Sequence, residues 1–295
     1  MTNFFQTILT IRDHPQPLAF IFIKILGVNI AKRFFVIKRN GYNLSIENND
    51  MSLSLFHKGR NMYRGFEILL EKLLKKGDNF IDVGGSIGFH SIYAKNIVKH
   101  GKVIMVEPMP ELVKTASINF NLNKLDIKII PAAISQDSKS VEMADLEGRS
   151  HIFNKNFESN SLKNDPTIIG DKKFSNEYES KLIIPSQTLD SITKEFDKIS
   201  IIKIDTEGAE LFTLKSGMNT FDKTTAFIVG LFNPYTTSRF GYEASDVAYL
   251  LIDKGFSNTY RVGGSENISL MPLDITNEKF DSPDYYLFSR THISI

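Results

Sequence analysis

A short apolar run that leads directly into a glycine-rich turn and then a helix is the feature that most constrains this fold. Residues 79–83 (NFIDV) are typical of a strand that is buried on both faces. The turn GGSIG follows at residues 84–88, and residues 89–100 have the character of a helix. A second apolar strand, KVIMVEP, ends near Glu107, and a helix from Pro110 to Asn123 and the strand IKIIPAA come after it. This alternation predicts an α/β fold with a doubly wound, mostly parallel sheet.

The glycine turn predicts a bound ligand. Without side chains, Gly84, Gly85 and Gly88 let a ligand approach the backbone, and the turn points the free N–H groups of the next helix at it. Ligands of open parallel sheets lie beyond the carboxyl ends of the strands, where Glu107 ends the next strand and can accept both hydroxyls of a ribose. A tight turn would explain any one glycine, but the whole pattern predicts a cofactor that carries a nucleoside.

The residue at position 82 narrows the choice of cofactor. A dinucleotide fold prefers the spacing G-x-G-x-x-G, with the helix end facing a pyrophosphate, and the carboxylate of Asp82 would repel that group. The same carboxylate can hold an ammonium group, directly or through water, as in the amino-acid part of S-adenosylmethionine. The alternative is that Asp82 caps the turn and has only a structural role.

Composition excludes several other classes of protein. The 295 residues include no cysteine, which excludes disulfides, thiolate metal sites and a cysteine nucleophile. The 6 histidines are scattered without a His-x-x-x-His pair, which argues against a zinc hydrolase. A net charge of +1 provides no electrostatic footprint for nucleic acid. We therefore expect neither a nucleic-acid partner nor a bound metal.

Strings that occur in order along the chain carry a family resemblance. FIDVGGSIGFHSIYA, VIMVEPMPE, INFNLN, LDSI and IIKIDTEGAELFTLKSG together resemble the FkbM family of S-adenosylmethionine-dependent methyltransferases. The most specific string, KIDTEGAE at residues 203–210, is similar to the family signature K-x-D-x-E-G-x-E. The resemblance runs from roughly Glu67 to Phe232. It implies a Rossmann-like, seven-stranded methyltransferase sheet that is parallel except for one C-terminal strand, and O-methylation of sugars, polyketides or other small metabolites.

The resemblance also implies which residues bind S-adenosylmethionine. The glycine turn and Asp82 would form the pocket for the methionine part, and Glu107 would bind the ribose hydroxyls. Pro108 would shape the loop that follows, and Ala132 and Ala133 would lie near the adenine. The implied cofactor-binding residues are Asp82, Gly84, Gly85, Ser86, Gly88, Glu107, Pro108 and Ala133.

The chain departs from the family pattern at several places. The family usually has an Ala-Asn pair where this chain has Gly85 and Ser86, so Ser86 is expected to change the local hydrogen bonding. Gly230 stands where the family usually has a glutamate, which removes a carboxylate from the carboxyl edge of the sheet. Residues 148–181 form a long polar stretch, which we interpret as a lid or specificity insertion on the acceptor side, with an inert surface excursion as the alternative.

The acidic signature supplies the candidate catalytic residues. Asp205 and Glu207 follow a buried-type strand, so they are expected to project into the crevice that holds the methyl donor. Methyl transfer to a hydroxyl needs an aligned acceptor oxygen and a base for its proton. Asp205 is the first candidate for this base, Glu207 and Lys203 are the second, and His90 and His151 are further alternatives.

Structural roles are the alternative for part of the signature. Glu207 and Gly208 would open a helix, whose N-terminus favours negative charge. Lys203 could pair with Glu207 or Glu210. The late loop that contains Tyr235 and Arg239 suits a sugar or another polar acceptor, although a plain surface loop would explain it as well.

Residues 1–60 predict a helical and β-hairpin extension ahead of a methyltransferase domain at residues 61–295. The apolar segment Leu18–Ala31 is 14 residues long, short of the roughly 20 that a membrane-spanning helix needs. We interpret it as an amphipathic helix packed on the domain or on a second copy, which favours a homodimer, with peripheral membrane contact as the alternative. Asn40 and Gly41 predict the hairpin turn, and Tyr63–Lys76 predicts an amphipathic helix. We expect a cytoplasmic protein without a transmembrane segment.

These patterns favour an S-adenosylmethionine-dependent O-methyltransferase that acts on a sugar or another small molecule. One alternative is a nicotinamide-dependent oxidoreductase, against which Asp82 and the missing glycine triad argue. The other alternative, prompted by Gly230, is a non-catalytic module that binds S-adenosylmethionine.

Overall fold

The computed structural model describes residues 25, 27–31, 36–39, 41–45, 47, 64–144, 151–152, 181–230, 234–263, 268–280 and 285–294. Most of the apolar segment Leu18–Ala31 and most of the polar stretch 148–181 lie outside the described residues, so the predictions for both remain untested.

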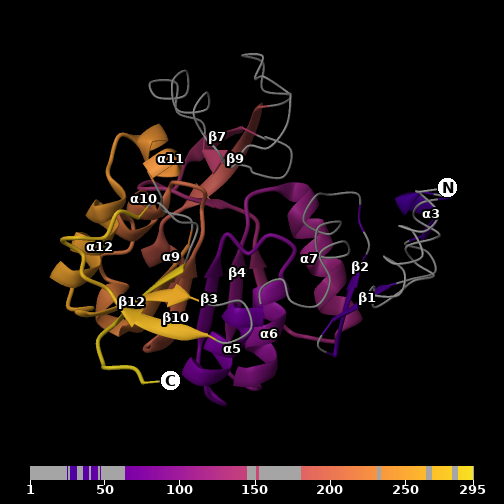
Figure 1. The fold of residues 1–295 in the computed structure, drawn as a ribbon. Helices are drawn as coiled ribbons and strands as arrows, with labels where there is room; N and C mark the ends of the chain where they lie inside the picture. Colours follow the sequence, from indigo (N-terminus) through magenta and orange to yellow (C-terminus); the bar gives the residue numbers. More distant parts are fainter. Residues whose placement is uncertain are drawn as a thin grey trace, which may run out of the picture.

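A central sheet organises the molecule (Figure 1). Its strands are β3 (Phe80–Val83), β4 (Val103–Val106), β5 (Lys128–Ile130), β10 (Ile199–Ile204), β11 (Thr224–Val229), β12 (Asn258–Gly263), β13 (Ser269–Pro272) and β14 (Tyr285–Ser289). The sheet is 8-stranded, in the order β13-β12-β14-β11-β10-β3-β4-β5. The run from β11 to β5 is parallel throughout, whereas β14 is antiparallel to both of its neighbours. The predicted doubly wound, mostly parallel sheet is therefore confirmed.

One edge of the sheet differs from the expectation. β13 pairs antiparallel with β12 and adds an eighth strand to the seven that the resemblance implies. Two strands therefore run against the others, β13 and β14, instead of one. The physical reason is local, because β13 follows β12 closely in the chain and covers an edge that would otherwise expose unpaired backbone groups.

The strand order reverses between β3 and β10. From β3 the chain builds outward through β4 to β5, and it then returns to the other side of β3 with β10. Ligands of open α/β sheets bind at such a switch point, beyond the carboxyl ends of the strands. The register places Lys203 directly beside Asp82 and Ile204 beside Val83. Residues of the acidic signature and of the glycine turn therefore meet at this point.

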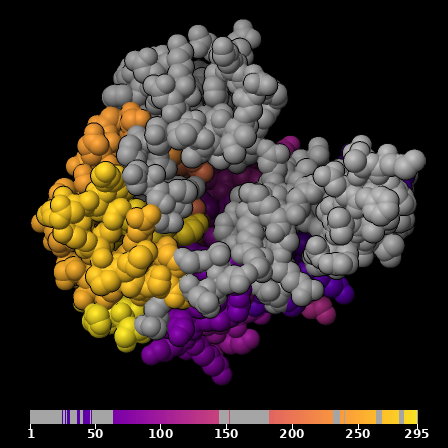
Figure 2. All heavy atoms as spheres, viewed as in Figure 1, coloured from indigo at the N-terminus to yellow at the C-terminus, as the bar shows by residue number. Residues whose placement is uncertain are grey.

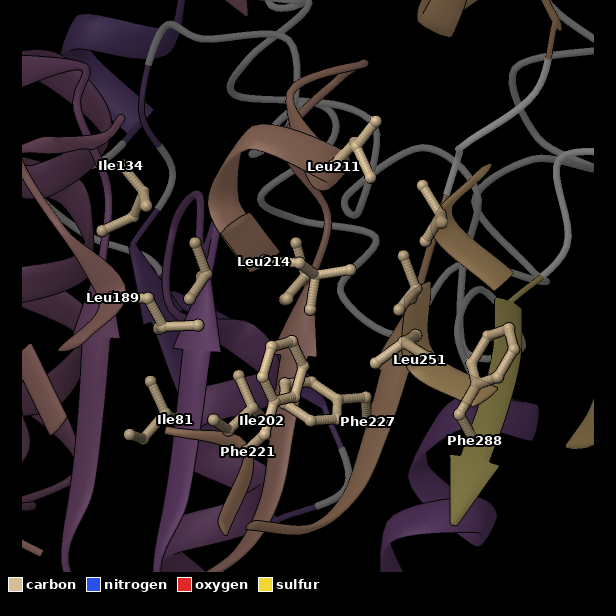
Figure 3. Packing of buried hydrophobic residues seen from close by; sticks show 14 of the residues in the cluster. Ile81, Ile134, Leu189, Ile202, Leu211, Leu214, Phe221, Phe227, Leu251 and Phe288 are labelled. Atoms are coloured by element: carbon tan, nitrogen blue, oxygen red, sulfur yellow. The ribbon is translucent and has the colours of Figure 1, made fainter. Parts of the chain in front are cut away.

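Helices cover both faces of the sheet (Figure 1). The longer ones are α5 (Arg64–Leu73), α6 (Phe89–Val98), α7 (Pro110–Leu122) and α12 (Ala244–Asp253); shorter ones include α3 (Val28–Ala31), α9 (Leu189–Thr193), α10 (Glu210–Lys215) and α11 (Pro234–Thr237). Side chains of α5, α6 and α7 share one apolar cluster with alternate strand residues such as Phe80 and Ile201. The intervening residues, such as Ile81 and Ile202, pack against α9, α10 and α12 on the opposite face (Figure 3).

The helix predicted over Tyr63–Lys76 is present as α5. Phe66, Leu69 and Leu70 are buried, as the helical period predicted. The helix ends earlier than predicted, at Leu73, and the chain then turns at Gly77, which has a φ of +93°.

A second, smaller sheet lies beside the first. It contains β6 (Ala133–Ile134), β7 (Ser140–Ala144), β8 (His151–Ile152) and β9 (Lys181–Gln187), in the order β6-β9-β7-β8. The predicted strand IKIIPAA is divided at Pro131, so its first half belongs to the central sheet and its second half to the small one. Proline cannot donate a ladder hydrogen bond, which explains the break.

The predicted N-terminal hairpin is confirmed. β1 (Val36–Arg39) pairs antiparallel with β2 (Tyr42–Ser45), and Gly41 between them has a φ of +84°. β2 is attached to α7 by the side chain of Asn123, which accepts a hydrogen bond from Asn43 N at 2.9 Å and donates one to Asn43 O at 2.7 Å.

Asn119, one turn earlier on α7, links this hairpin to the glycine turn. Its side-chain oxygen accepts a hydrogen bond from Ser45 N at 2.7 Å, and its side-chain nitrogen donates one to Ile87 O at 2.9 Å. The side chain is fully buried. The hairpin is therefore hydrogen-bonded to α7 and, through Asn119, to the glycine turn. Among the residues that the structure describes, no helix is long and apolar enough to cross a membrane.

Replacing Asn119 with alanine should destabilise the protein by about 2–3 kcal/mol, because it removes hydrogen bonds from two buried backbone groups. The exposed Asn121 on the same helix provides the matched control, since Asn121→Ala should cost less than about 0.5 kcal/mol. Urea unfolding of both variants measures the difference. Equal stabilities would show that Asn119 does not fasten the hairpin to the domain.

Candidate active site

The glycine turn between β3 and α6 depends on contacts within the protein itself. Gly84 has a φ of +75°, and a Cβ atom added to it would lie 1.8 Å from the backbone oxygen of Asp205. A side chain would therefore separate the turn from the loop that follows β10. Gly88 completes the turn just before α6 begins. A Cβ atom at Gly85 would instead meet the flexible side chain of Met105 at 2.2 Å.

Ser86 affects the turn through its backbone. Its φ is +53°, and its N–H donates a hydrogen bond to Glu107 Oε2 at 2.8 Å. The other carboxylate oxygen of Glu107 accepts a hydrogen bond from Met109 N at 3.0 Å. Glu107 therefore connects the turn after β3 to the loop after β4.

Glu107 is a buried carboxylate with remaining capacity for hydrogen bonds. Burial raises its pKa to about 7, although the N–H groups of Met109 and Ser86 and the charge of Lys203 oppose this shift. An ionised carboxylate offers about four lone-pair sites, of which the protein uses two here. The side chain can therefore accept further donors, such as ribose hydroxyls.

Asp82 and Lys203 form a buried ion pair across β3 and β10. Lys203 Nζ lies 2.9 Å from Asp82 Oδ1, and Lys203 is only 2% exposed. Ser91 donates a hydrogen bond to the other oxygen of Asp82 at 2.7 Å. Burial alone would raise the pKa of Asp82, but Lys203, with His90 and Ser91, outweighs it and lowers the pKa. Burial likewise opposes the charge on Lys203, and Asp82 and Asp205 outweigh it and raise the pKa of Lys203.

These contacts change the interpretation of both residues. Lys203 also donates a hydrogen bond to Gly84 O at 2.9 Å, so it ties the glycine turn to β10. Its partners are not Glu207 or Glu210, which were the predicted structural alternatives. Both oxygens of Asp82 have protein partners, the side chains of Lys203 and Ser91, which gives Asp82 a structural role that differs from the predicted cap for the turn. Contact between Asp82 and an ammonium group stays a prediction.

The loop that carries the acidic signature is organised by its last glutamate. Glu210 is fully buried, and its Oε1 accepts hydrogen bonds from Thr206 N at 2.8 Å and Gly208 N at 3.2 Å. Burial raises the pKa of Glu210 to about 6. The prediction that Glu207 opens the helix is wrong, because α10 begins at Glu210 and Glu207 lies before it with a φ of +53°. The sequence analysis did not predict that Glu210 shapes the loop. Its position in the first turn of the helix, where a carboxylate is favoured, could have indicated this role.

Asp205 stands at the carboxyl edge of β10 next to a residue that the sequence analysis missed. Its Oδ2 accepts a hydrogen bond from the Tyr285 hydroxyl at 2.9 Å and lies 3.9 Å from Lys203 Nζ. Tyr285 begins β14, which is antiparallel to β11, so the start of β14 meets the same edge. The glycine at position 230 was the sequence feature that could have indicated this neighbour. A Cβ atom at Gly230 would come within 2.4 Å of the Tyr285 ring.

Aromatic rings surround this edge. The His90 ring lies 4.2 Å from that of Phe66 and 6.5 Å from that of Tyr285. The predicted alternative base His90 therefore lies near the ring of Tyr285, whose hydroxyl contacts Asp205. The side chains of the other candidates in the insertion and the late loop, His151, Tyr235 and Arg239, lie outside the described residues.

Both residues predicted to lie near the adenine, Ala132 and Ala133, are buried. Ala133 packs in a small apolar cluster with Met109 and Ile184. Pro108, which was predicted to shape the loop after β4, lines an open groove of about 500 Å³ with Pro110, Pro131 and Ile184. Within the described part of the chain, no group of three or more His, Asp or Glu residues is placed to hold a metal ion.

The comparison with protein families decides which family the chain belongs to. The sequence profile described as the methyltransferase FkbM domain matches residues 82–261, more than half of the chain. The chain belongs to the FkbM methyltransferase family. The match begins at Asp82 and includes the glycine turn, Glu107 and the acidic signature. The protein is therefore a methyltransferase with S-adenosylmethionine as its cofactor, and the predicted resemblance is confirmed.

Solved methyltransferase structures are similar to this FkbM methyltransferase at low sequence identity. A precorrin-6y methyltransferase from Geobacter metallireducens is 10% identical, with a TM-score of 0.42 over 78% of this chain and 88% of its own. An O-methyltransferase from Thermotoga maritima is 14% identical, with a TM-score of 0.37 over 76% of this chain and 62% of its own. An rRNA methylase from Streptococcus thermophilus is 11% identical, with a TM-score of 0.39 over 77% of this chain and 95% of its own. No curated protein matches the chain.

Gly84→Ala should destabilise the enzyme by about 3 kcal/mol or more, because it adds backbone strain and a clash with Asp205 O. Gly41 has a similar φ of +84° with nothing within 4 Å of an added Cβ, so Gly41→Ala should cost only about 1 kcal/mol. Chemical unfolding of both variants separates the cost of backbone strain, which both share, from the cost of the clash with Asp205 O, which only Gly84→Ala has. Similar losses in the two variants would contradict the close contact between the turn and the β10 loop.

Glu107→Gln should change how stability depends on pH. The folded protein holds the Glu107 proton more tightly than the unfolded chain, because the pKa rises from 4.5 to about 7. This stabilisation is complete below pH 4.5 and is lost as the pH rises through about 7. Glutamine is neutral at every pH. The free energy of unfolding of the variant should therefore rise by about 3 kcal/mol relative to that of wild type between pH 4.5 and pH values above about 7. Unfolding free energies of both proteins at several pH values test this, and a difference independent of pH would contradict it.

Proposed function

We propose that this enzyme methylates a hydroxyl oxygen of a small metabolite, such as a sugar, and that Asp205 is the general base. The observation that carries this proposal is the position of the Asp205 carboxylate. It is 15% exposed, it follows β10 at the switch point of the sheet, and its backbone oxygen lies against Gly84. A carboxylate at the edge of the donor site, and still open to solvent, can reach an acceptor.

The residues present fit S-adenosylmethionine. Gly84 and Ser86 of the turn are only half-buried, so their backbone is open to the methionine part. Glu107 faces the same turn and has hydrogen-bonding capacity left for the ribose. The groove at Pro108 and Pro131, beside the loops after β4 and β5, offers an apolar surface for the adenine.

The chemistry that follows is simple. When bound, S-adenosylmethionine supplies an electrophilic methyl carbon, which the acceptor oxygen attacks as the carbon–sulfur bond breaks and its electron pair stays on sulfur. Asp205 would accept the hydroxyl proton at the carboxylate oxygen that Tyr285 does not occupy. Alignment of the oxygen with the methyl carbon would supply much of the rate enhancement.

The other predicted catalytic residues take different places in this proposal. Lys203 is engaged with Asp82 and Gly84, so we assign it to holding the site together. Glu207 lies in the loop beside Asp205 and remains the second candidate for contact with the acceptor.

The two alternatives lose their support. The family match decides against a nicotinamide-dependent oxidoreductase. The non-catalytic module was prompted by the missing glutamate at Gly230, but Tyr285 fills the space beside Gly230 and brings a hydroxyl to Asp205. The carboxyl edge therefore keeps a polar group near the proposed base.

Incubation with S-adenosylmethionine labelled with ¹³C at the methyl group, together with a pool of polar metabolites, tests this proposal. NMR of the labelled methyl distinguishes O-methyl from N-methyl and C-methyl products, and we expect an O-methyl product. Asp205→Asn should lower its rate by at least about 100-fold while S-adenosylhomocysteine still binds. An N-methyl or C-methyl product would contradict hydroxyl methylation, and full activity of the variant would remove Asp205 from the mechanism.

A further inference from the structure

Asp205 lies between two groups that can satisfy its carboxylate. The Tyr285 hydroxyl donates to Oδ2 at 2.9 Å, and Lys203 Nζ lies 3.9 Å from the same oxygen. Lys203 is already bound to Asp82 at 2.9 Å. The contact between Lys203 and Asp205 is therefore a long ion pair, and a small rotation of the Asp205 side chain would shorten it to a direct hydrogen bond that neutralises more of the carboxylate charge.

Tyr285 is fixed in a position that prevents this rotation. Its ring lies 4.7 Å from the Phe66 ring of α5 and within 6.5 Å of the His90 ring of α6. In the space-filling view, the C-terminal elements in yellow and the region of α5 and α6 in purple meet on the same face (Figure 2). The ring of Tyr285 on β14 therefore packs against side chains of α5 and α6.

Gly230 completes this arrangement. An added Cβ atom would lie 2.4 Å from the Tyr285 ring and 3.2 Å from the Asp205 carboxylate carbon. No larger side chain at position 230 is compatible with this placement of Tyr285. Gly230 and Tyr285 therefore act together, since the first leaves the space that the second occupies.

We propose that Tyr285 is a positioning residue that holds the Asp205 carboxylate away from Lys203, so that its negative charge faces the sulfonium of the methyl donor. This inference rests on the proposed function, which places the donor at the glycine turn. S-adenosylmethionine and S-adenosylhomocysteine share their adenosine and amino-acid groups, but only the first carries the sulfonium charge. A carboxylate that keeps part of its charge near that sulfur should therefore favour the donor over its product and assist product release.

Calorimetric titration of wild type and Tyr285→Phe with each of the two compounds tests the proposal without an acceptor. Phenylalanine keeps the ring contacts and removes only the hydroxyl. Wild type should bind S-adenosylmethionine more tightly than S-adenosylhomocysteine, and the variant should lose about tenfold of that preference with little change in its affinity for S-adenosylhomocysteine. Asp205→Asn should lose the same preference, and the double variant should lose no more than either single one.

Tyr286→Phe is the matched control, because Tyr286 is the next residue on β14 and packs with Phe280 on the opposite face. It should leave the preference unchanged. The proposal is overturned if wild type shows no preference, if Tyr285→Phe keeps it, or if the variant loses affinity equally for both compounds. Failure to find an O-methyl product would contradict the proposed reaction. It would leave the role of Tyr285 in the preference for the donor unaffected, since the titration needs no acceptor.

Discussion

The buried pair of Asp82 and Lys203 is the interaction on which the rest of the site depends. It joins β3 and β10 where the strand order reverses, and Lys203 also holds the backbone of Gly84. Removing one partner of such a pair typically costs about 3–5 kcal/mol, because the other charge stays buried. The pair therefore fixes the two loops that lead out of these strands, and both loops carry residues of the proposed site.

Each loop is then shaped by a second buried carboxylate. Glu107 accepts a hydrogen bond from Ser86 N in the glycine turn. Glu210 accepts hydrogen bonds from Thr206 N and Gly208 N in the signature loop. Burial raises the pKa of both, to about 7 and about 6. The enzyme thus holds its backbone loops with carboxylates that accept hydrogen bonds from N–H donors, and the proposed base, Asp205, is a third carboxylate that is more exposed than these two.

The features that could be predicted from the sequence are those that depend on interactions between residues close together in the chain. The strand–turn–helix unit, the hairpin at Gly41 and the helix α5 come from short-range periodicity and turn chemistry, and they are confirmed. The pairing of Lys203 with Asp82 joins residues 121 positions apart, and that of Tyr285 with Asp205 joins residues 80 positions apart. Such contacts depend on the order and direction of strands in the finished sheet, which no local pattern encodes. The resemblance indicated the acidic signature but could not show which of its carboxylates shapes the loop.

The decisive measurement is a crystal structure of the enzyme with S-adenosylhomocysteine. We expect the methionine part along the turn at Gly84, the ribose hydroxyls within hydrogen-bonding distance of Glu107, and the sulfur facing Asp205. A ribose bound away from Glu107, or a sulfur on the far side of the turn from Asp205, would contradict it.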